Sequence, residues 1–396
     1  MNFSDIVITH ALRTPIGKFQ GSLANLTAVQ LGTHAVKSIL GQSKIDPKLV
    51  GEVVMGHARQ AGNGPNPARQ VAIHAGIPDT ATAFTINKAC ASGLKAIVLA
   101  AQSVMNGDVE VAVAGGMESM SNVPFMLSAD ARQGWRLGHH EVTDLMYRDG
   151  FHCPLADQLM GRTAETLRMR YKITREEQDE FAAGSHNKAE AAQKAGKFKD
   201  EIAPITLKDK KGETVMERDE GIREGCKPAD MAKLKPVFMD DGTIHPGNAS
   251  GITDGGSALL LMSATTAKKL GYAPLARLEG YAIAGVDPKI MGIGPLPATA
   301  KLNSKLGLTN ADYDLFEVNE AFAAQVLACD REMKLPRDKM NVNGGAIALG
   351  HPIGNTGARL VTTLVHEMKR RGDVKRGLAT LCVSGGMGFS LSLTRQ

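Results

Sequence analysis

Aromatic side chains are scarce in this chain of 396 residues, at 4% of the sequence and with a single tryptophan. Proteins that bind single-stranded nucleic acid stack the bases on such side chains, and this chain offers little material for that. The formal net charge of +5 is mild, and the basic residues do not gather as a nucleic-acid-binding face requires. We therefore expect no nucleic acid partner, and the charge is compatible with an anionic small molecule without requiring one.

Long hydrophobic runs are also missing, because no uninterrupted apolar stretch reaches the roughly 20 residues of a membrane helix. An expected strand begins at Ile6, which leaves no room for a targeting peptide. The cysteines are odd in number, scattered and without a CxxC pair, which favours a reducing compartment over a disulfide framework. We expect a cytoplasmic protein without a membrane span. The five cysteines are Cys90, Cys153, Cys226, Cys329 and Cys382.

The common cofactor patterns are incomplete. Two GxG segments, starting at Gly62 and Gly292, lack the third glycine of a dinucleotide-binding fingerprint. The histidine pair His139-His140 and the neighbours His152-Cys153 match no zinc spacing. We therefore expect no metal and no tightly bound cofactor.

The length indicates two or three domains, since single cores stop growing at about 250 to 300 residues. Strand and helix patterns alternate up to Ser119, which predicts βαβ units on a largely parallel sheet. Residues 120–247 are more polar and mostly helical, as in an inserted lid, although a plain second domain without ligand contacts remains an alternative. A glycine-rich turn over 247–256 then leads back to the sheet pattern.

The second half repeats the order of the first. Gly107-Asp108-Val109 and Gly115-Gly116-Met117 flank a strand, and so do Gly372-Asp373-Val374 and Gly385-Gly386-Met387. The same short segments in the same order favour a duplicated domain over a chance similarity between the two halves. The main expected strands cover 6–9, 52–55, 83–86, 109–114, 257–262, 340–342 and 379–383, and the main expected helices cover 27–40, 66–75, 89–104, 174–195 and 356–370.

Cys90 stands where the strand 83–86 gives way to the helix that follows. Free backbone N–H groups and the positive end of the helix dipole favour a thiolate there. A packed cysteine is an equally good interpretation of this stretch alone, because free cysteines are often buried. If the two halves pack about a pseudo-twofold axis, equivalent strand ends meet, and Cys90 approaches His351 of the other half.

Three further residues are candidates for the same site. His351 lies in a loop of glycine and small apolar residues, where it cannot be an ordinary helix-face side chain. Cys382 ends a strand before a glycine turn, although a buried strand cysteine is the alternative. Asn319 follows a strand and starts a helical segment, where it could be a simple N-cap.

These motifs together resemble those of the thiolase family over essentially the whole chain. The matching segments are 87–93 around Cys90, 319–323, 344–354 with His351, and Cys382. The resemblance implies an α/β fold in which duplicated halves form a five-layered αβαβα core, with a helical loop domain over the site, and a homodimer or homotetramer. The implied division is 1–119 plus 248–272 for the N-terminal half, 120–247 for the loop domain and 273–396 for the C-terminal half.

The resemblance also implies residue roles. Cys90 would form an acyl-enzyme, His351 would take its proton, and Cys382 would act as general acid and base at the α-carbon of acetyl-CoA. One oxyanion hole would consist of His351 and a water held by Asn319, and the other of the N–H groups of Cys90 and Ser384. The family commonly has glycine in place of Ser384, a difference that leaves a backbone donor in place.

Coenzyme A and acetyl-CoA are the implied substrates. The most closely implied activity is acetyl-CoA C-acetyltransferase, with a degradative 3-ketoacyl-CoA thiolase as the alternative and a non-catalytic acyl-CoA or lipid-binding relative as a third. Leu159 and Asp230 replace a histidine and a serine of short-chain biosynthetic members, so the chain-length preference stays open. The implied substrate-binding residues are Met160, Arg223, Met231, Leu234, Phe238, Ser250, Met291 and Phe322.

Overall fold

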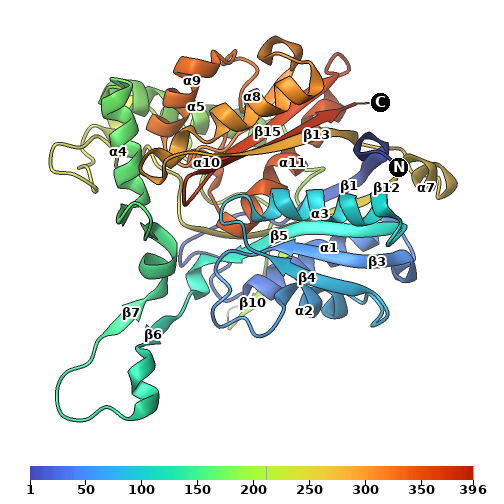
Figure 1. The fold of residues 1–396 in the computed structure, drawn as a ribbon, viewed down its shortest axis with the longest axis horizontal. Coiled ribbons are helices and arrows are strands. Elements are labelled where there is room, and N and C mark those ends of the chain that lie inside the picture. Colours follow the sequence, from blue (N-terminus) through green and yellow to red (C-terminus); the bar gives the residue numbers. More distant parts are fainter. Residues whose placement is uncertain (211, 396) are drawn as a thin grey trace.

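Two helices lie side by side at the centre of the molecule (Figure 1). In the computed structural model, which describes residues 1–210 and 212–395, these are α3 (Ser92–Asn106) and α11 (Ile353–Arg370). Their apolar side chains share one core cluster with strands of both halves. Residues 353–368 of α11 are all buried, so this helix is enclosed on every side.

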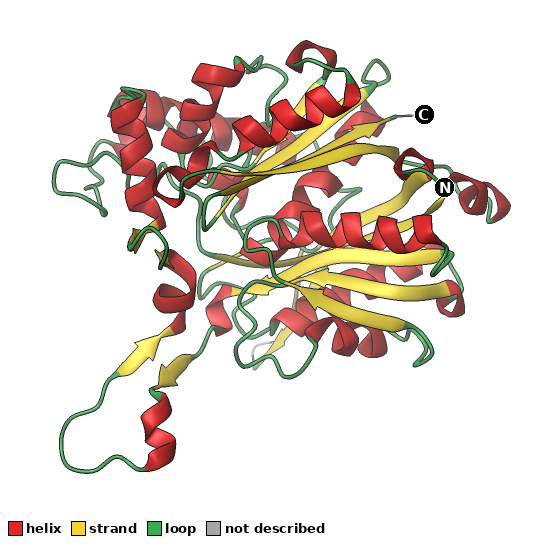
Figure 2. Cartoon of the chain, in the orientation of Figure 1, coloured by secondary structure: helices red, strands yellow, loops and turns green. Residues whose placement is uncertain are grey.

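The central helices are sandwiched between the two halves of a continuous sheet (Figure 2). The halves join where β1 pairs with β13 through Val7–Arg277 and Ile8–Ala276. The strand order is β4 (Thr82–Ile86), β3 (Val50–Gly56), β5 (Val111–Ser119), β12 (Thr253–Ser263), β1 (Ile6–Arg13), β13 (Ala276–Gly285), β16 (Met387–Thr394), β15 (Arg376–Val383) and β14 (Leu315–Val318), with β2 (Gly17–Lys18) beside β12.

Further helices cover the outer faces of the sheet. α1 (Ala28–Ser43) and α2 (Pro67–His74) pack on the N-terminal half. α8 (Pro295–Leu306) and α9 (Ala323–Met333) pack on the C-terminal half. The layers are therefore helix, sheet, helix, sheet and helix, which confirms the predicted five-layered α/β fold with duplicated halves.

The prediction of a largely parallel sheet is wrong, because the sheet is mixed. The pairs β3–β4, β3–β5 and β14–β15 are parallel, but β12 runs antiparallel between β1 and β5. β15 and β16 are joined by only three residues, Ser384 to Gly386, and a connection that short can link only antiparallel strands.

Two local predictions also differ from the structure. Of the strand predicted at 340–342, one parallel bridge remains, between Met340 and Phe316. The pairing stops there because Asn341 has a φ of 44° and its side-chain amide bonds the N–H and C=O of Val318. Residues 253–256 belong to β12 and not to a turn. A Cβ on Gly256 would lie 2.8 Å from the carbonyl oxygen of Leu31, so glycine there permits close packing of α1.

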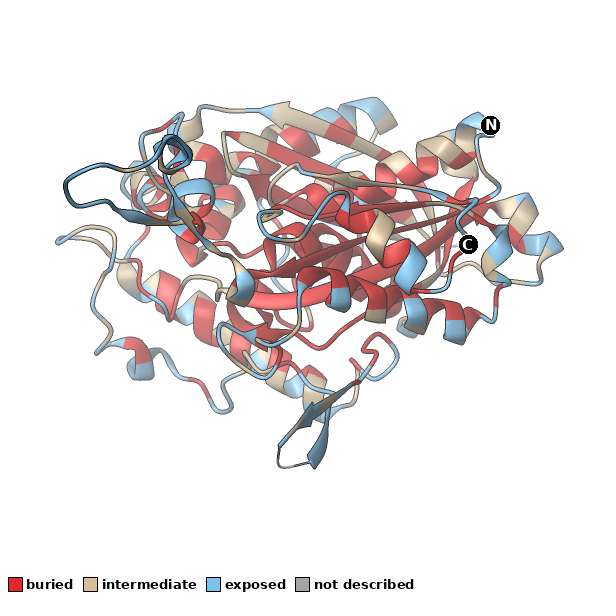
Figure 3. Ribbon diagram, turned by 90° about the horizontal axis from the view of Figure 1, so that it is seen from below, coloured by how far each residue is buried: buried red, intermediate tan, exposed pale blue. Residues whose placement is uncertain are grey.

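Residues 120–247 contain two long helices and three small hairpins. Thr174 caps the second helix in the predicted capping box with Glu177. The hairpin of β6 and β7 extends away from the rest of the molecule in Figure 1 and carries exposed Phe125 and Val142. In contrast, the residues at the centre of the molecule are buried (Figure 3). The elements are β6 (Phe125–Leu127), β7 (Val142–Asp144), β8 (His152–Cys153), β9 (Gln158–Leu159), α4 (Met160–Arg170), α5 (Arg175–Lys194), β10 (Ile205–Asp209), β11 (Gly212–Met216) and α6 (Pro228–Met231).

Two short helices complete the described chain, α7 (Ala264–Lys269) and α10 (Ala346–Leu349). Within the residues that the structure describes, none of the helices combines the length and hydropathy needed to cross a bilayer.

Glycines set how closely α3 and α11 approach each other. A Cβ on Gly93 would lie 2.7 Å from the backbone nitrogen of Ala358, and one on Gly357 would lie 2.7 Å from Cβ of Leu94. Real Cβ atoms do not approach that closely. The central helices can therefore touch only because these positions lack side chains.

Gly357→Ala is expected to lower the free energy of unfolding by about 3 kcal/mol, because two packed helices must separate to admit the methyl group. Gly41→Ala is the matched control, since a Cβ there meets nothing within 4 Å in α1 and alanine favours a helix by about 1 kcal/mol. Thermal unfolding at one protein concentration measures both. Equal midpoints for the two variants would contradict the close contact.

Candidate active site

Cys90 occupies a sharp elbow between β4 and α3. Ala89, the residue before it, has a φ of 45°, which is uncommon for a residue with a side chain. Asn87 Oδ1 accepts a hydrogen bond from the Ala89 N–H at 2.9 Å, and Ser92 Oγ donates to the Ala89 carbonyl at 2.6 Å. The motif around Cys90 thus holds the strained elbow, and the cysteine lies two residues ahead of the helix instead of within its first turn.

His351 occupies the equivalent position in the second half. It lies two residues ahead of α11, as Cys90 lies two residues ahead of α3, and these two helices pack together. The imidazole is buried, and its Nδ1 lies 2.7 Å from Thr356 Oγ1. Burial, together with the nearby cations Arg359 and Arg59, lowers the pKa of His351 to about 3. The ring is therefore neutral at physiological pH, and one of its two nitrogens carries no proton.

The surroundings of the Cys90 thiol contradict the sequence-based expectation of a thiolate. Burial raises its pKa, and this outweighs the opposing effects of the Ser384 N–H, the Arg59 guanidinium and its own N–H. The resting group is a thiol, and it needs a base. The Ser384 N–H, in the turn after β15, is close enough to the sulfur to oppose that rise in pKa.

Cys382 is fully buried near the end of β15. Its pKa lies well above the usual range, first because of burial and second because of the nearby Cys90 sulfur. Cys382 packs with Met291 and Ala321. The two sulfurs are thus close enough to influence each other, and Cys382 holds its proton at neutral pH.

Asn319 follows β14 and is fully buried. The N-cap interpretation fails, because α9 begins at Ala323 and Phe322 occupies its N-cap position. Both polar atoms of the Asn319 amide lack a hydrogen bond to the described protein atoms. Buried amides are rarely left without partners, so this side chain is suited to a substrate or a water molecule.

The predicted substrate-binding residues fall into adjoining groups. Met160, Met291 and Phe322 surround Cys382, and the ring of Phe238 meets that of Phe322 edge to face at 6.2 Å. The Ser250 N–H donates to the carbonyl of Ala321 at 3.0 Å, next to the same cluster. The other three predicted residues lie outside the cluster around Cys382. Met231 and Leu234 pack with Ile347. Arg223 is exposed, and its backbone N–H donates to His186 Nδ1.

Sequence reasoning missed a buried carboxylate, Glu118, at the end of β5. It accepts hydrogen bonds from the N–H groups of Ala58, Arg59 and Gly354, and its Oε1 lies 3.1 Å from His57 Nε2. Glu118 thereby ties the chain after β3 to the start of α11 in the other half. The only sequence signal was a charged residue in an otherwise uncharged strand.

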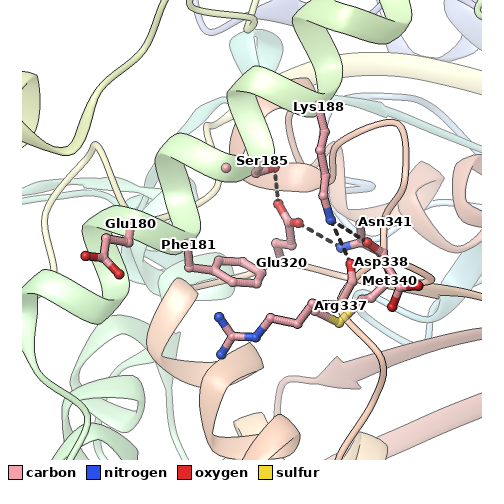
Figure 4. A pocket seen from close by; sticks show the side chains of 10 residues that line it. Glu180, Phe181, Ser185, Lys188, Glu320, Arg337, Asp338, Met340 and Asn341 are labelled. Atoms are coloured by element: carbon pink, nitrogen blue, oxygen red, sulfur yellow. Dashed lines mark hydrogen bonds between the residues drawn. The ribbon is translucent and has the colours of Figure 1, made fainter.

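A second missed group is centred on Glu320, the residue after Asn319, and is shown in Figure 4. The buried carboxylate of Glu320 accepts hydrogen bonds from Ser185 Oγ at 2.7 Å, Asn341 Nδ2 at 2.7 Å and the Ile347 N–H at 3.1 Å. It borders a cavity of about 330 Å³ that Lys188 also lines. Cys90, His351 and Cys382 do not line this cavity, so Glu320 braces the loop before His351 from outside the reaction centre.

Among the described residues, no group of three or more His, Cys, Asp or Glu side chains is arranged to hold a metal ion. The predicted site residues instead supply two thiols that influence each other, a neutral imidazole and an amide. Together they can form a covalent intermediate on sulfur, move a proton and stabilise an oxyanion.

Comparisons with known proteins match the chain over nearly its whole length. The family model "Thiolase, N-terminal domain" matches residues 6–265, and "Thiolase, C-terminal domain" matches residues 272–395. The chain is 51% identical to an acetyl-CoA acetyltransferase of Cupriavidus necator over 99% of this chain and 100% of that protein. It is 52% identical to the acetyl-CoA acetyltransferase of Pseudomonas aeruginosa over 99% of this chain and 100% of that protein.

Solved structures match as well. The Bacillus anthracis acetyl-CoA acetyltransferase gives a TM-score of 0.95 at 47% identity, with 98% of each chain covered. Human mitochondrial 3-ketoacyl-CoA thiolase in complex with CoA gives a TM-score of 0.94 at 41% identity, with 99% of this chain and 98% of that chain covered.

Proposed function

The chain belongs to the thiolase family, and from this premise we propose that Cys90, His351, Cys382 and Asn319 carry its reaction. The protein is an acyltransferase that acts on acetyl-CoA. The observation that supports the assignment most strongly is that Cys90 and His351 each lie two residues ahead of one of the two packed helices α3 and α11, whose first turns touch at Gly93 and Ala358. We propose thiolysis and synthesis of acetoacetyl-CoA as the main activity.

In thiolysis, His351 takes the proton of the Cys90 thiol, and the thiolate attacks the 3-keto carbon of the substrate. The bond between C2 and C3 breaks, the acyl group stays on Cys90, and the departing enolate takes a proton from Cys382 to give acetyl-CoA. The Cys382 thiolate then takes the proton of the coenzyme A thiol, whose sulfur attacks the acyl-enzyme, and the Cys90 thiolate that leaves recovers its proton from His351. Synthesis runs through the same steps in reverse, with Cys382 as the base.

Negative charge develops on oxygen in both halves of the reaction, and preorganised donors stabilise it. We propose that His351 and Asn319 serve the thioester oxygen, with a water bridging to the free Asn319 amide. The Ser384 N–H, which points at the Cys90 sulfur, and the N–H of Cys90 itself would serve the oxygen of the acyl-enzyme.

Coenzyme A and its thioesters are the proposed substrates, and no tightly bound cofactor enters the steps above. Of the predicted contacts, Met160, Met291 and Phe322 are the best supported, because they pack around Cys382. The edge strand β4 has partly buried Phe84 and Ile86 and offers its edge to a second copy, which supports a homodimer or homotetramer. All five cysteines are free, which supports a cytoplasmic location.

Thiolysis rates for 3-ketoacyl-CoA substrates of increasing length test the proposed activity. We expect kcat/KM to be highest for acetoacetyl-CoA and to fall by about tenfold or more when a few methylene groups are added, because one methylene is worth about 1 to 3 kcal/mol in a fitted pocket. A kcat/KM that rises with chain length would instead favour the degradative 3-ketoacyl-CoA thiolase.

A further inference from the structure

The hydroxyl of Thr356 makes two hydrogen bonds beside the proposed base. It lies 2.7 Å from His351 Nδ1 and donates to the carbonyl oxygen of Pro352 at 3.0 Å. A threonine hydroxyl has one proton to donate. Both bonds form together only when Nδ1 carries a proton and donates it to Oγ1.

The remaining ring nitrogen is left without a protein partner. Among the described residues, the ring forms one hydrogen bond, between Nδ1 and Thr356 Oγ1, and Nε2 forms none. The charged groups around the ring are Arg359 and Arg59, which oppose its protonation, and Glu118, which favours it. Because the ring is neutral, its function depends on which of the two nitrogens carries the single proton.

We propose that Thr356 is a positioning residue that fixes the tautomer of His351, with the proton on Nδ1 and Nε2 free to accept the proton of Cys90. This inference rests on the proposed function, in which His351 is the base. Thr356 is held rigidly, because it is fully buried in the first turn of α11 and its N–H bonds the Pro352 carbonyl at 2.9 Å. Glu118 anchors the same turn through the Gly354 N–H at 2.7 Å.

Three variants test the proposal. Thr356→Val keeps the shape and removes the hydroxyl, and Thr356→Ser restores it. Thr362→Val is the matched control, because Thr362 is also fully buried on α11 and its hydroxyl bonds the Ala358 carbonyl at 2.9 Å, just as Thr356 bonds Pro352. Thermal unfolding of all three confirms that they are folded.

We expect Thr356→Val to lower kcat for thiolysis by about 10- to 100-fold with KM nearly unchanged, as for other groups that orient a functional histidine. The rate of alkylation of Cys90 by iodoacetamide at neutral pH should fall in parallel, because the thiol loses its proton acceptor. Thr356→Ser should recover most of both rates, and Thr362→Val should change neither by more than about twofold.

Equal losses in Thr356→Val and Thr362→Val, or an unchanged alkylation rate in Thr356→Val, would overturn the proposal. His351→Ala separates this failure from failure of the proposed function. If His351→Ala is inactive while Thr356→Val is normal, only the role of Thr356 is wrong. If His351→Ala also keeps full turnover, the assignment of the base is wrong.

Discussion

Cys90→Ser is expected to lower kcat for thiolysis of acetoacetyl-CoA by at least about a thousandfold, because removal of a covalent nucleophile costs that much or more. A serine hydroxyl at the elbow would have to lose a far less acidic proton to His351. The loss of acetoacetyl-CoA can be followed directly in a steady-state assay. Labelled acetyl-CoA should leave its acetyl group on the peptide that contains Cys90 in the native protein and on no peptide of the variant.

Cys153→Ser is the control for this experiment, since Cys153 is a free, buried cysteine in β8. It should retain nearly full activity. Turnover by Cys90→Ser within tenfold of the native rate, or a label on another cysteine, would remove Cys90 from the mechanism.

Cys382→Ala should separate the two halves of the reaction. Acyl transfer from acetyl-CoA to Cys90 needs only Cys90, His351 and the oxyanion donors, so exchange of label between acetyl-CoA and free coenzyme A should persist. Thiolysis and condensation should both fall by about 100- to 10,000-fold, the range for a lost general acid or base. Because burial raises the pKa of Cys382, condensation in the native protein should quicken with rising pH as the thiol ionises.

Cys329→Ala is the matched control, because Cys329 is also a buried cysteine, one whose pKa burial raises to about 12. It removes a buried sulfur close to Cys382 and should spare the carbon–carbon step. A parallel loss of exchange and of thiolysis in Cys382→Ala would show that Cys382 does not act in that step alone.

The duplicated pattern in the sequence predicts most of the fold and the equivalent positions of Cys90 and His351. The shared GDV and GGM segments reveal equivalent halves, and equivalence places each residue just ahead of one of the two packed helices. The strand predicted at 340–342 is reduced to one bridge at Met340, because the side chain of Asn341 pairs with Val318 where a backbone ladder would continue. The pattern of apolar residues along a short segment does not show when a side chain will take the hydrogen bonds of a neighbouring strand.

The electrostatics of the site could not be predicted from local sequence. The helix dipole and free N–H groups near Cys90 suggest a low pKa, but burial among residues from both halves decides its direction. Glu118 was missed for a similar reason, since its partner Gly354 is 236 residues away in the chain. Thr356 is only five residues from His351, but its role depends on the Pro352 carbonyl that accepts its proton.

The contact of α3 with α11 through Gly93 and Gly357 also bears on how the enzyme can be redesigned. The separation of Cys90 and His351 is fixed by two buried helices, whereas Met160, Phe238 and several other predicted substrate contacts come from residues 120–247. The packing that holds Cys90 and His351 therefore lies outside residues 120–247, and so do two of the proposed substrate contacts, Met291 and Phe322. An exchange of residues 120–247 with those of a relative should shift chain-length preference in part, while the positions of Cys90 and His351 stay the same.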